Sequence, residues 1–298
     1  MYPIVLVHGI ARFDFLAQLF RRIPGVDLDH FQYFNGIAGH LTDNGFGPVF
    51  SPNLDFAASS DDRAATLKKK IEGYLGETGV EKVHIIAHSM GGLDARRMIS
   101  MLGMANSVAS LTTIGTPHLG TVLADHIIND RHGDDLIRGL RVFLNLEGAN
   151  DLTVSACADF NRDTEEDEAK NSVFYQTYAG SEDKDRIFGP LLPSFKYLSR
   201  HLPPNGVEAP EGQTIANDGL VPLESQQWTS AREAGGARKE IPQHVFPFPA
   251  DHLNQTGWWD WEEREGLFEL ANPLRQKREY EDKVKAVYLG IAESVKDK

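Results

Sequence analysis

The feature that most constrains the fold is a serine placed between an apolar strand and a helix. Residues 83–92 read VHIIAHSMGG, so a mainly apolar run ends at Ser89 and two glycines follow closely. A serine at a sharp strand-to-helix turn needs small residues two positions before and two positions after it, and Ala87 and Gly91 occupy these positions. Alanine replaces the first glycine of the G-x-S-x-G pattern but keeps the small size. The segment therefore predicts a nucleophilic serine on a strand–helix corner of an α/β sheet.

The rest of the chain alternates short apolar runs with helical periodicity, which is typical of a parallel sheet. Apolar runs predict strands at residues 4–7, 48–51, 83–87, 111–115, 173–179 and 241–246. Helical spacing predicts helices over 61–79, from Ser89 to about Leu102, and from Tyr280 to Val295. The last helix is expected to dock on the core rather than on a partner. We therefore expect a single α/β domain over residues 1–298, with a mainly parallel sheet of about six strands flanked by helices.

Two segments interrupt this alternation. Residues 121–150 form a candidate lid insertion, because apolar residues share one helical face: Leu136, Leu140, Phe143 and Leu144. A plain core helix would show the same pattern. Residues 187–222 hold six of the fifteen prolines and are expected to form an irregular, Pro-rich insertion.

The composition excludes several classes of protein. Asp and Glu total 43 against 30 Lys and Arg, a net charge of −13, and such a surface repels nucleic-acid phosphates. No apolar run approaches the roughly 18 residues of a membrane-spanning helix. Cys157, the single cysteine, cannot form an internal disulfide and is predicted to be a buried structural thiol. The first residues show no signal-peptide pattern, so the chain is expected to be intracellular, or a mature or truncated form. It is also expected to be a monomer.

A serine hydroxyl needs a base that takes its proton and an acid that orients the base. The serine turn resembles that of the α/β-hydrolases, in which the chain order is serine, acid, histidine. His252 lies in a loop shortly after the last predicted strand and is the preferred base. His244 lies within that strand and ranks second.

Asp218 is the preferred acid, because it lies between Ser89 and His252 in an Asn-Asp-Gly turn at the end of a long irregular segment. Asp183 and Asp185 are runners-up, since they follow the predicted strand at 173–179. An ordinary turn residue is the alternative interpretation of Asp218.

Ester chemistry at a serine also needs N–H groups that bind the developing oxyanion. One is expected from the backbone of Met90, directly after the nucleophile at a helix N-terminus. The other is expected from Ile10, in the loop after the first strand, where Gly9 permits a tight turn. His8 precedes the serine in the chain and is predicted to hold this loop by hydrogen bonding.

Five blocks of sequence resemble the bacterial true lipases of the pseudomonad type, in that family's order: YPIVLVHGI at 2–10, AHSMGGLDAR at 87–96, IGTPHLGT at 114–121, NDGLV at 217–221 and DHL at 251–253. The resemblance implies an α/β-hydrolase fold, hydrolysis of triacylglycerols or other carboxylic esters, and a helical lid over the site. It assigns three catalytic roles, to Ser89 as nucleophile, Asp218 as acid and His252 as base. It also assigns the oxyanion donors to Ile10 and Met90. His118 lies near the site by resemblance and has no assigned role.

The chain departs from this family in two respects. Many members hold a structural calcium near the catalytic histidine, with an aspartate two residues after it. Here that position is Asn254, whose amide oxygen brings no charge, and no second aspartate stands at a matching distance upstream of Asp218. We therefore expect no cofactor, with structural calcium as the less favoured alternative. Residues 187–222 and the tail beyond Trp261 match nothing in the family.

These observations predict a serine hydrolase of carboxylic esters, with a triacylglycerol lipase preferred and a lipid or ester substrate at an oil–water interface. A short-chain carboxylesterase, a phospholipase or an acyltransferase would carry the same three residues, because the acyl pocket and the lid separate these activities. A non-catalytic lipid-binding protein on a hydrolase scaffold is the alternative from another class. The resemblance implies secretion, and a cytoplasmic location stays open.

Overall fold

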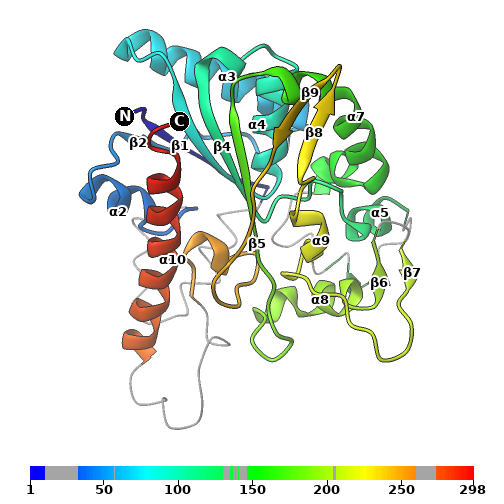
Figure 1. The fold of residues 1–298 in the computed structure, drawn as a ribbon. Coiled ribbons are helices and arrows are strands. Elements are labelled where there is room, and N and C mark those ends of the chain that lie inside the picture. The colour runs from blue at the N-terminus through cyan, green and yellow to red at the C-terminus, as the bar shows by residue number, and fades with distance from the viewer. Residues whose placement is uncertain are drawn as a thin grey trace.

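In the computed structural model, a six-stranded sheet lies between two layers of helices (Figure 1). The structure describes residues 1–10, 33–56, 58–129, 146–203, 206–259 and 273–298, with positions 135, 136, 138 and 140 in addition. All pairs in the sheet are parallel, in the order β10-β5-β4-β3-β1-β2. The strands are β1 (Ile4–Val7), β2 (Val49–Phe50), β3 (Val83–His88), β4 (Val108–Ile114), β5 (Phe174–Ala179) and β10 (Gln243–Val245).

The predicted sheet of about six parallel strands is confirmed, and the strand ends differ by a few residues. β4 already begins at Val108, and β10 is shorter than the run that predicts it. Ile4 pairs with both His84 and Val49, so β1 lies between β3 and β2. Strands β1, β3 and β4 are buried throughout, because helices cover both faces of a parallel sheet.

Alternate residues of a strand point to opposite faces, and β1 shows this directly. Val5 and Val7 pack with helices α3 (Ser60–Thr78) and α4 (Met90–Ser100) on one face. Ile4 and Leu6 pack with α2 (Ile37–Asp43) and α10 (Pro273–Val295) on the other. The terminal helix therefore docks on the core of its own domain, as predicted. None of the described helices is long and apolar enough to cross a membrane.

Two elements beside α4 were not predicted from the sequence. Helix α7 (Val154–Lys170) contacts a hairpin of strands β8 (Ala231–Ala234) and β9 (Ala237–Glu240). Gly235 and Gly236 form the hairpin turn with φ values of 58° and 82°. Two positive φ values in a two-residue turn require glycine or asparagine, so this Gly-Gly pair is the sequence signal that identifies the hairpin.

The two insertions pack against each other. The segment 121–150 contains α5 (Val122–Asn129) and the start of a 3₁₀ helix, η2 (Leu146–Leu152), whereas Phe143 and Leu144 lie outside the described residues. α5 contacts α8 (Leu192–Leu198) of the second insertion.

The segment 187–222 is more regular than expected from its prolines. It also holds η3 (Gly189–Leu191), a ladder of β6 (His201–Leu202) and β7 (Val207–Glu208), and the bridge that precedes α9 (Leu223–Gln226). Pro190 and Pro193 stand in the first turns of η3 and α8, where a missing N–H costs nothing.

Candidate active site

Ser89 lies at the turn between β3 and α4, as the sequence predicts. Its φ of 57° is the one positive value among the non-glycine residues that the structure describes. This conformation is strained for a residue with a side chain and is typical of functional sites. A Cβ on Gly91 would lie 2.7 Å from the carbonyl oxygen of His8, and one on Gly92 would overlap the side chain of Thr116. The two glycines therefore let the turn pack against the loops that follow β1 and β4.

Three side chains that are far apart in the sequence meet at this turn. His252 Nε2 lies 2.8 Å from Ser89 Oγ, and His252 Nδ1 lies 2.7 Å from Asp218 Oδ2. Because a carboxylate only accepts, Nδ1 carries the proton and Nε2 can accept one from the hydroxyl. The other carboxylate oxygen, Oδ1, accepts the backbone N–H groups of Leu220 and Val221, which fixes its orientation. All three side chains belong to buried residues.

The runner-up residues lie elsewhere. His244 is on β10 at the edge of the sheet, where its ring stacks on Tyr178 at a centroid distance of 4.6 Å. Asp183 and Asp185 are exposed in the loop after β5. The preference for His252 and Asp218 therefore agrees with the geometry.

The loop after β1 is held by His8 and Arg63. His8 Nδ1 donates to the carbonyl oxygen of Gly9 at 2.8 Å, and Nε2 accepts the N–H of Leu54 at 3.0 Å. Burial lowers the pKa of His8 to about 4, so the neutral ring keeps one donor and one acceptor. Arg63 Nη2 donates to the carbonyl oxygens of His8 and Gly9 at 2.7 and 3.5 Å. Since a peptide bond is planar and trans, the N–H of Ile10 points away from these donors.

Arg63 is itself paired inside the protein. Its Nε lies 2.8 Å from Asp94 Oδ2, and both side chains are fully buried. Ser60 Oγ donates to the other Asp94 oxygen at 2.9 Å. Burial raises the pKa of Asp94 to about 6, while the Arg63 charge acts in the opposite direction. The pair connects the loop after β1 to α4, the helix that begins directly after the nucleophile.

Sequence reasoning missed Arg63 and Asp94. Arg63 stands four residues before Leu67, on the apolar stripe of α3, and a charged residue on a buried helix face is the signal that identifies such a group. Asp94 carries no comparable signal, because α4 is buried on most of its surface. The carbonyl oxygen of Ser89 accepts a hydrogen bond of 2.8 Å from Thr116 Oγ1, another contact that spacing alone does not reveal.

An apolar pocket lies beside Ser89 and His252. The described residues that line it are mostly apolar and come from several parts of the chain: Ile10, Pro117, Leu123, Ala124, Ile127, Ala149, Leu152, Leu220, Val221 and Leu253. Met90 begins α4, so its backbone N–H is at the helix N-terminus next to Ser89. The arrangement places a hydroxyl, a base and a helix-end N–H group beside an apolar pocket.

The loop that carries His252 does not fit a calcium ion. Asn254 Oδ1 accepts the N–H of Asp251 at 3.2 Å, and Asn254 Nδ2 donates to the carbonyl oxygen of Trp258 at 2.7 Å. Asp251 accepts two N–H groups of its own turn and that of Phe188. These side chains close the loop by hydrogen bonds. Among the residues that the structure describes, no three acidic, histidine or cysteine side chains gather as metal ligands would.

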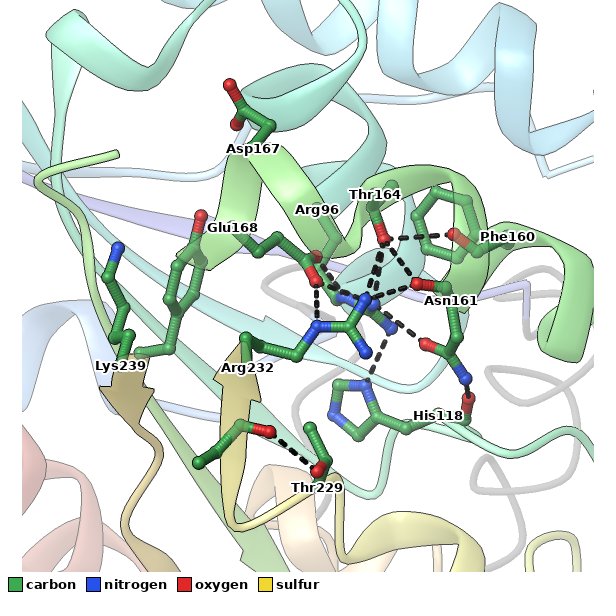
Figure 2. Close-up of polar contacts among 12 residues, drawn as sticks. Arg96, His118, Phe160, Asn161, Thr164, Asp167, Glu168, Thr229, Arg232 and Lys239 are labelled. Carbon is green, nitrogen blue, oxygen red and sulfur yellow. Dashed lines mark hydrogen bonds and ion pairs between the residues drawn. The ribbon is translucent and has the colours of Figure 1, made fainter. Parts of the chain in front are cut away.

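A buried charged cluster lies on the α4 side of the sheet (Figure 2). Glu168 on α7 accepts from Arg96 on α4 and pairs with Arg232 on β8, each at 2.8 Å. Arg96 Nη1 lies 3.2 Å from His118 Nδ1. Burial, assisted by the two arginine charges, holds the pKa of His118 well below its usual range. His118 is therefore a neutral member of this cluster, which ties the loop after β4 to α4 and α7.

Cys157 is the buried thiol predicted from the sequence. It is 1% exposed, and its Sγ lies 3.5 Å from the carbonyl oxygen of Pro117. Burial raises the pKa of the thiol to about 12, so it carries no reactive thiolate.

Comparison with known proteins agrees with this geometry. Residues 62–172 match the family model of the PGAP1-like alpha/beta domain. The chain is 40% identical over 124 residues to a triacylglycerol lipase of Vibrio cholerae serotype O1, which covers 42% of this chain and 35% of that protein. A triacylglycerol lipase of Pseudarthrobacter phenanthrenivorans is 37% identical over 129 residues, or 42% of this chain and 36% of the relative. The chain thus matches about a third of the length of these curated relatives.

Solved structures extend the similarity in fold over most of the chain. The mature Bacillus licheniformis lipase BlEst2 aligns with a TM-score of 0.58 and 21% identity, over 85% of both chains. Phospholipase PlaB from Legionella pneumophila aligns with a TM-score of 0.58 and 14% identity, over 99% of this chain and 64% of that one. The predicted α/β-hydrolase fold and the resemblance to bacterial lipases are confirmed.

Proposed function

We propose that this chain is a serine hydrolase that cleaves carboxylic esters, with lipids as its substrate class and triacylglycerols preferred. The observation that carries the proposal is the series of hydrogen bonds from Ser89 Oγ through His252 to Asp218 beside an apolar pocket. The similarity to bacterial triacylglycerol lipases over part of the chain supports the same class of reaction.

In the first half-reaction, Ser89 Oγ attacks the ester carbonyl carbon while His252 Nε2 takes the hydroxyl proton. Asp218 fixes the imidazole orientation and stabilises its charged form. The backbone N–H groups of Met90 and Ile10 donate to the oxyanion, and their fixed orientation stabilises the transition state without reorganisation.

The tetrahedral intermediate then collapses to an acyl-enzyme. The alcohol leaves with the proton from His252, and the acyl group stays on Ser89 as an ester. A water molecule attacks this ester with His252 again as base, and the carboxylic acid leaves. The reaction needs no organic cofactor.

The pocket walls support an apolar acyl chain as the recognised group. Leu123, Ala124 and Ile127 of α5 form one side of the slot. α5 belongs to the segment 121–150, which we propose acts as a lid. A helix that lines the slot controls access of a long chain to Ser89 when it moves.

The test is a series of chromogenic esters from butyrate to palmitate, assayed on purified protein with an emulsified triacylglycerol in parallel. Ser89→Ala and His252→Ala are expected to abolish turnover, and Ser51→Ala, at an exposed serine, to leave it unchanged. Activity that disappears beyond hexanoate would restrict the protein to short esters.

Covalent labelling separates an enzyme from a lipid-binding scaffold. An organophosphonate is expected to label the wild type and Ser51→Ala but not Ser89→Ala. An unlabelled wild type, or turnover retained in Ser89→Ala, would contradict the assignment of the nucleophile.

A further inference from the structure

Gln255 lies three residues after His252, in the 3₁₀ turn η4 (Asn254–Thr256), and its side chain points back under the site. The residue is fully buried. Its Nε2 donates to Asp218 Oδ2 at 3.1 Å. The same oxygen accepts from His252 Nδ1, so the Gln255 amide shares the carboxylate oxygen that faces the imidazole.

Two glycines at the ends of neighbouring strands make room for this amide. A Cβ on Gly115, after β4, would overlap Gln255 Oε1, and a Cβ on Gly180, after β5, would lie 2.6 Å from Gln255 Nε2. Tyr288 of α10 donates to the Gln255 carbonyl oxygen at 3.0 Å and fixes the backbone. The Gln255 amide therefore occupies a space that the two glycines leave open, and its backbone is fixed by Tyr288.

The other end of the amide faces His88. Gln255 Oε1 and His88 Nε2 both lie next to Gly115, and the Gln255 side chain acts to raise the pKa of His88, against the larger effect of burial. Neither atom has a partner of regular hydrogen-bond geometry among the residues that the structure describes, and the backbone of His252 also faces the His88 ring. On its far side, His88 Nδ1 lies 2.6 Å from the hydroxyl of Tyr33, which lines the pocket.

The direction of these hydrogen bonds follows from the protonation states of His88 and Tyr33. Burial, followed by the neighbouring His252, holds the pKa of His88 well below its usual range, so the ring is neutral and carries one N–H. Burial raises the pKa of the Tyr33 hydroxyl, which therefore keeps its proton and donates it to His88 Nδ1. The N–H of His88 is then on Nε2 and faces Gln255 Oε1, which leaves the Gln255 NH₂ group for Asp218. If the amide were flipped, Gln255 Oε1 would face Asp218 Oδ2, and two acceptor oxygens cannot form a hydrogen bond.

We propose that Gln255 is a positioning residue for the Asp218–His252 pair, with its amide orientation set by His88 and Tyr33. The proposal rests on the proposed serine hydrolase function. In this role, the Gln255 N–H stabilises the negative charge on Asp218 Oδ2 and keeps that oxygen aligned with His252 Nδ1. The other ionisable groups around the amide, His88, Tyr33 and Tyr288, are buried and uncharged, so the pair responds to this one donor.

Gln255→Met tests the proposal, because methionine keeps the length of the side chain and removes both polar atoms. Without the amide donor, the carboxylate attracts the imidazolium more strongly. The acidic limb of the kcat/KM profile is then expected to move to higher pH by roughly half a unit. The free energy of a hydrogen bond to a charged group corresponds to more than one pKa unit, and only part of this change in the charge stabilisation of Asp218 is transmitted to His252. The kcat for a soluble ester is expected to fall roughly tenfold through loss of alignment, with little change in KM.

Gln176→Met is the matched control. Gln176 is 2% exposed on β5, and its Nε2 donates to Thr112 on β4 and Ser294 on α10 rather than to a residue of the triad. This variant is expected to lose thermal stability and to keep the pH profile of the wild type. Gly180→Ala is a second test, because the added Cβ displaces the amide while every side chain of the network stays, and it should shift the profile in the same direction.

The proton on His252 Nδ1 gives a readout that does not need turnover. A proton between histidine and carboxylate resonates far downfield in NMR, and its shift is expected to change in Gln255→Met and Gly180→Ala but not in Gln176→Met. An unmoved profile and resonance in Gln255→Met would overturn the positioning role. A wild type that keeps this resonance but cleaves no ester would instead contradict the proposed function.

Discussion

Replacing Arg63 with methionine separates stability from catalysis in this protein. Arg63 is fully buried and serves two purposes, because it neutralises Asp94 and donates to the carbonyl oxygens of His8 and Gly9. Arg63→Met keeps the apolar part of the side chain and removes the guanidinium. The loop after β1 then loses the donor to the His8 carbonyl oxygen and the longer bond to that of Gly9, whereas His8 Nδ1 still donates to the Gly9 carbonyl oxygen.

The expected cost in stability follows from the burial of the pair. Removing one partner of a buried ion pair costs about 3–5 kcal/mol, since the other charge is left uncompensated. Asp94 can limit this cost by binding a proton, because burial already raises its pKa to about 6. For a chain of this size the change corresponds to a fall in Tm of roughly 5–8 °C.

The expected cost in activity is separate. If the Ile10 peptide rotates, one oxyanion donor is lost, and such a loss lowers kcat by about 10²–10³-fold. The double variant Arg63→Met/Asp94→Leu removes both charges, and apolar replacement of a buried pair is often neutral for stability. We expect it to regain most of the Tm but not the kcat, because the His8 carbonyl oxygen still lacks the Arg63 donor.

Calorimetry and ester kinetics on the wild type, the single variant and the double variant check this reasoning. A double variant with wild-type kcat would show that the loop keeps its conformation without Arg63. A single variant with unchanged Tm would show that the pair adds nothing to stability.

Two further results are expected. The unfolding free energy should fall as the pH decreases from about 7 to 5, by up to about 1.4 kcal/mol per pH unit for each buried neutral histidine. Burial lowers the pKa of His8 to about 4 and the pKa values of His88 and His118 well below the usual range. The unfolded chain therefore binds protons in this pH range that the native state does not bind. His84, whose pKa burial also lowers to about 4, adds to this effect, whereas Asp94, with a raised pKa, acts in the opposite direction as a single group. Urea unfolding at several pH values measures this dependence. His8→Gln should make the unfolding free energy depend less on pH. A stability that increases toward pH 5 would refute the prediction. Dialysis against EDTA is expected to leave Tm and ester turnover unchanged, because Asn254 and Asp251 are already engaged in closing the His252 loop; a loss that added calcium restores would contradict this.

Local sequence determined much of the fold and the centre of the site. Apolar runs and their spacing predicted all six strands of the sheet, because strands of a parallel sheet covered on both faces are mainly apolar. Small residues around Ser89 predicted the sharp turn, because that geometry excludes larger side chains. The choice of Asp218 and His252 followed from the chain order serine, acid, histidine of the α/β-hydrolases that the sequence resembles.

Only the tertiary structure decided what surrounds these residues. Arg63, Asp94 and Gln255 act through contacts with segments that are distant in the chain, and no local pattern encodes those distances. Gly115 and Gly180 read as ordinary loop glycines until the fold places the Gln255 amide between them. The hydrogen bond from the Asp251 N–H to the Asn254 oxygen also appears only in three dimensions. Side-chain identity limits which hydrogen bonds a residue can form, but burial and the approach of other segments decide which ones it forms.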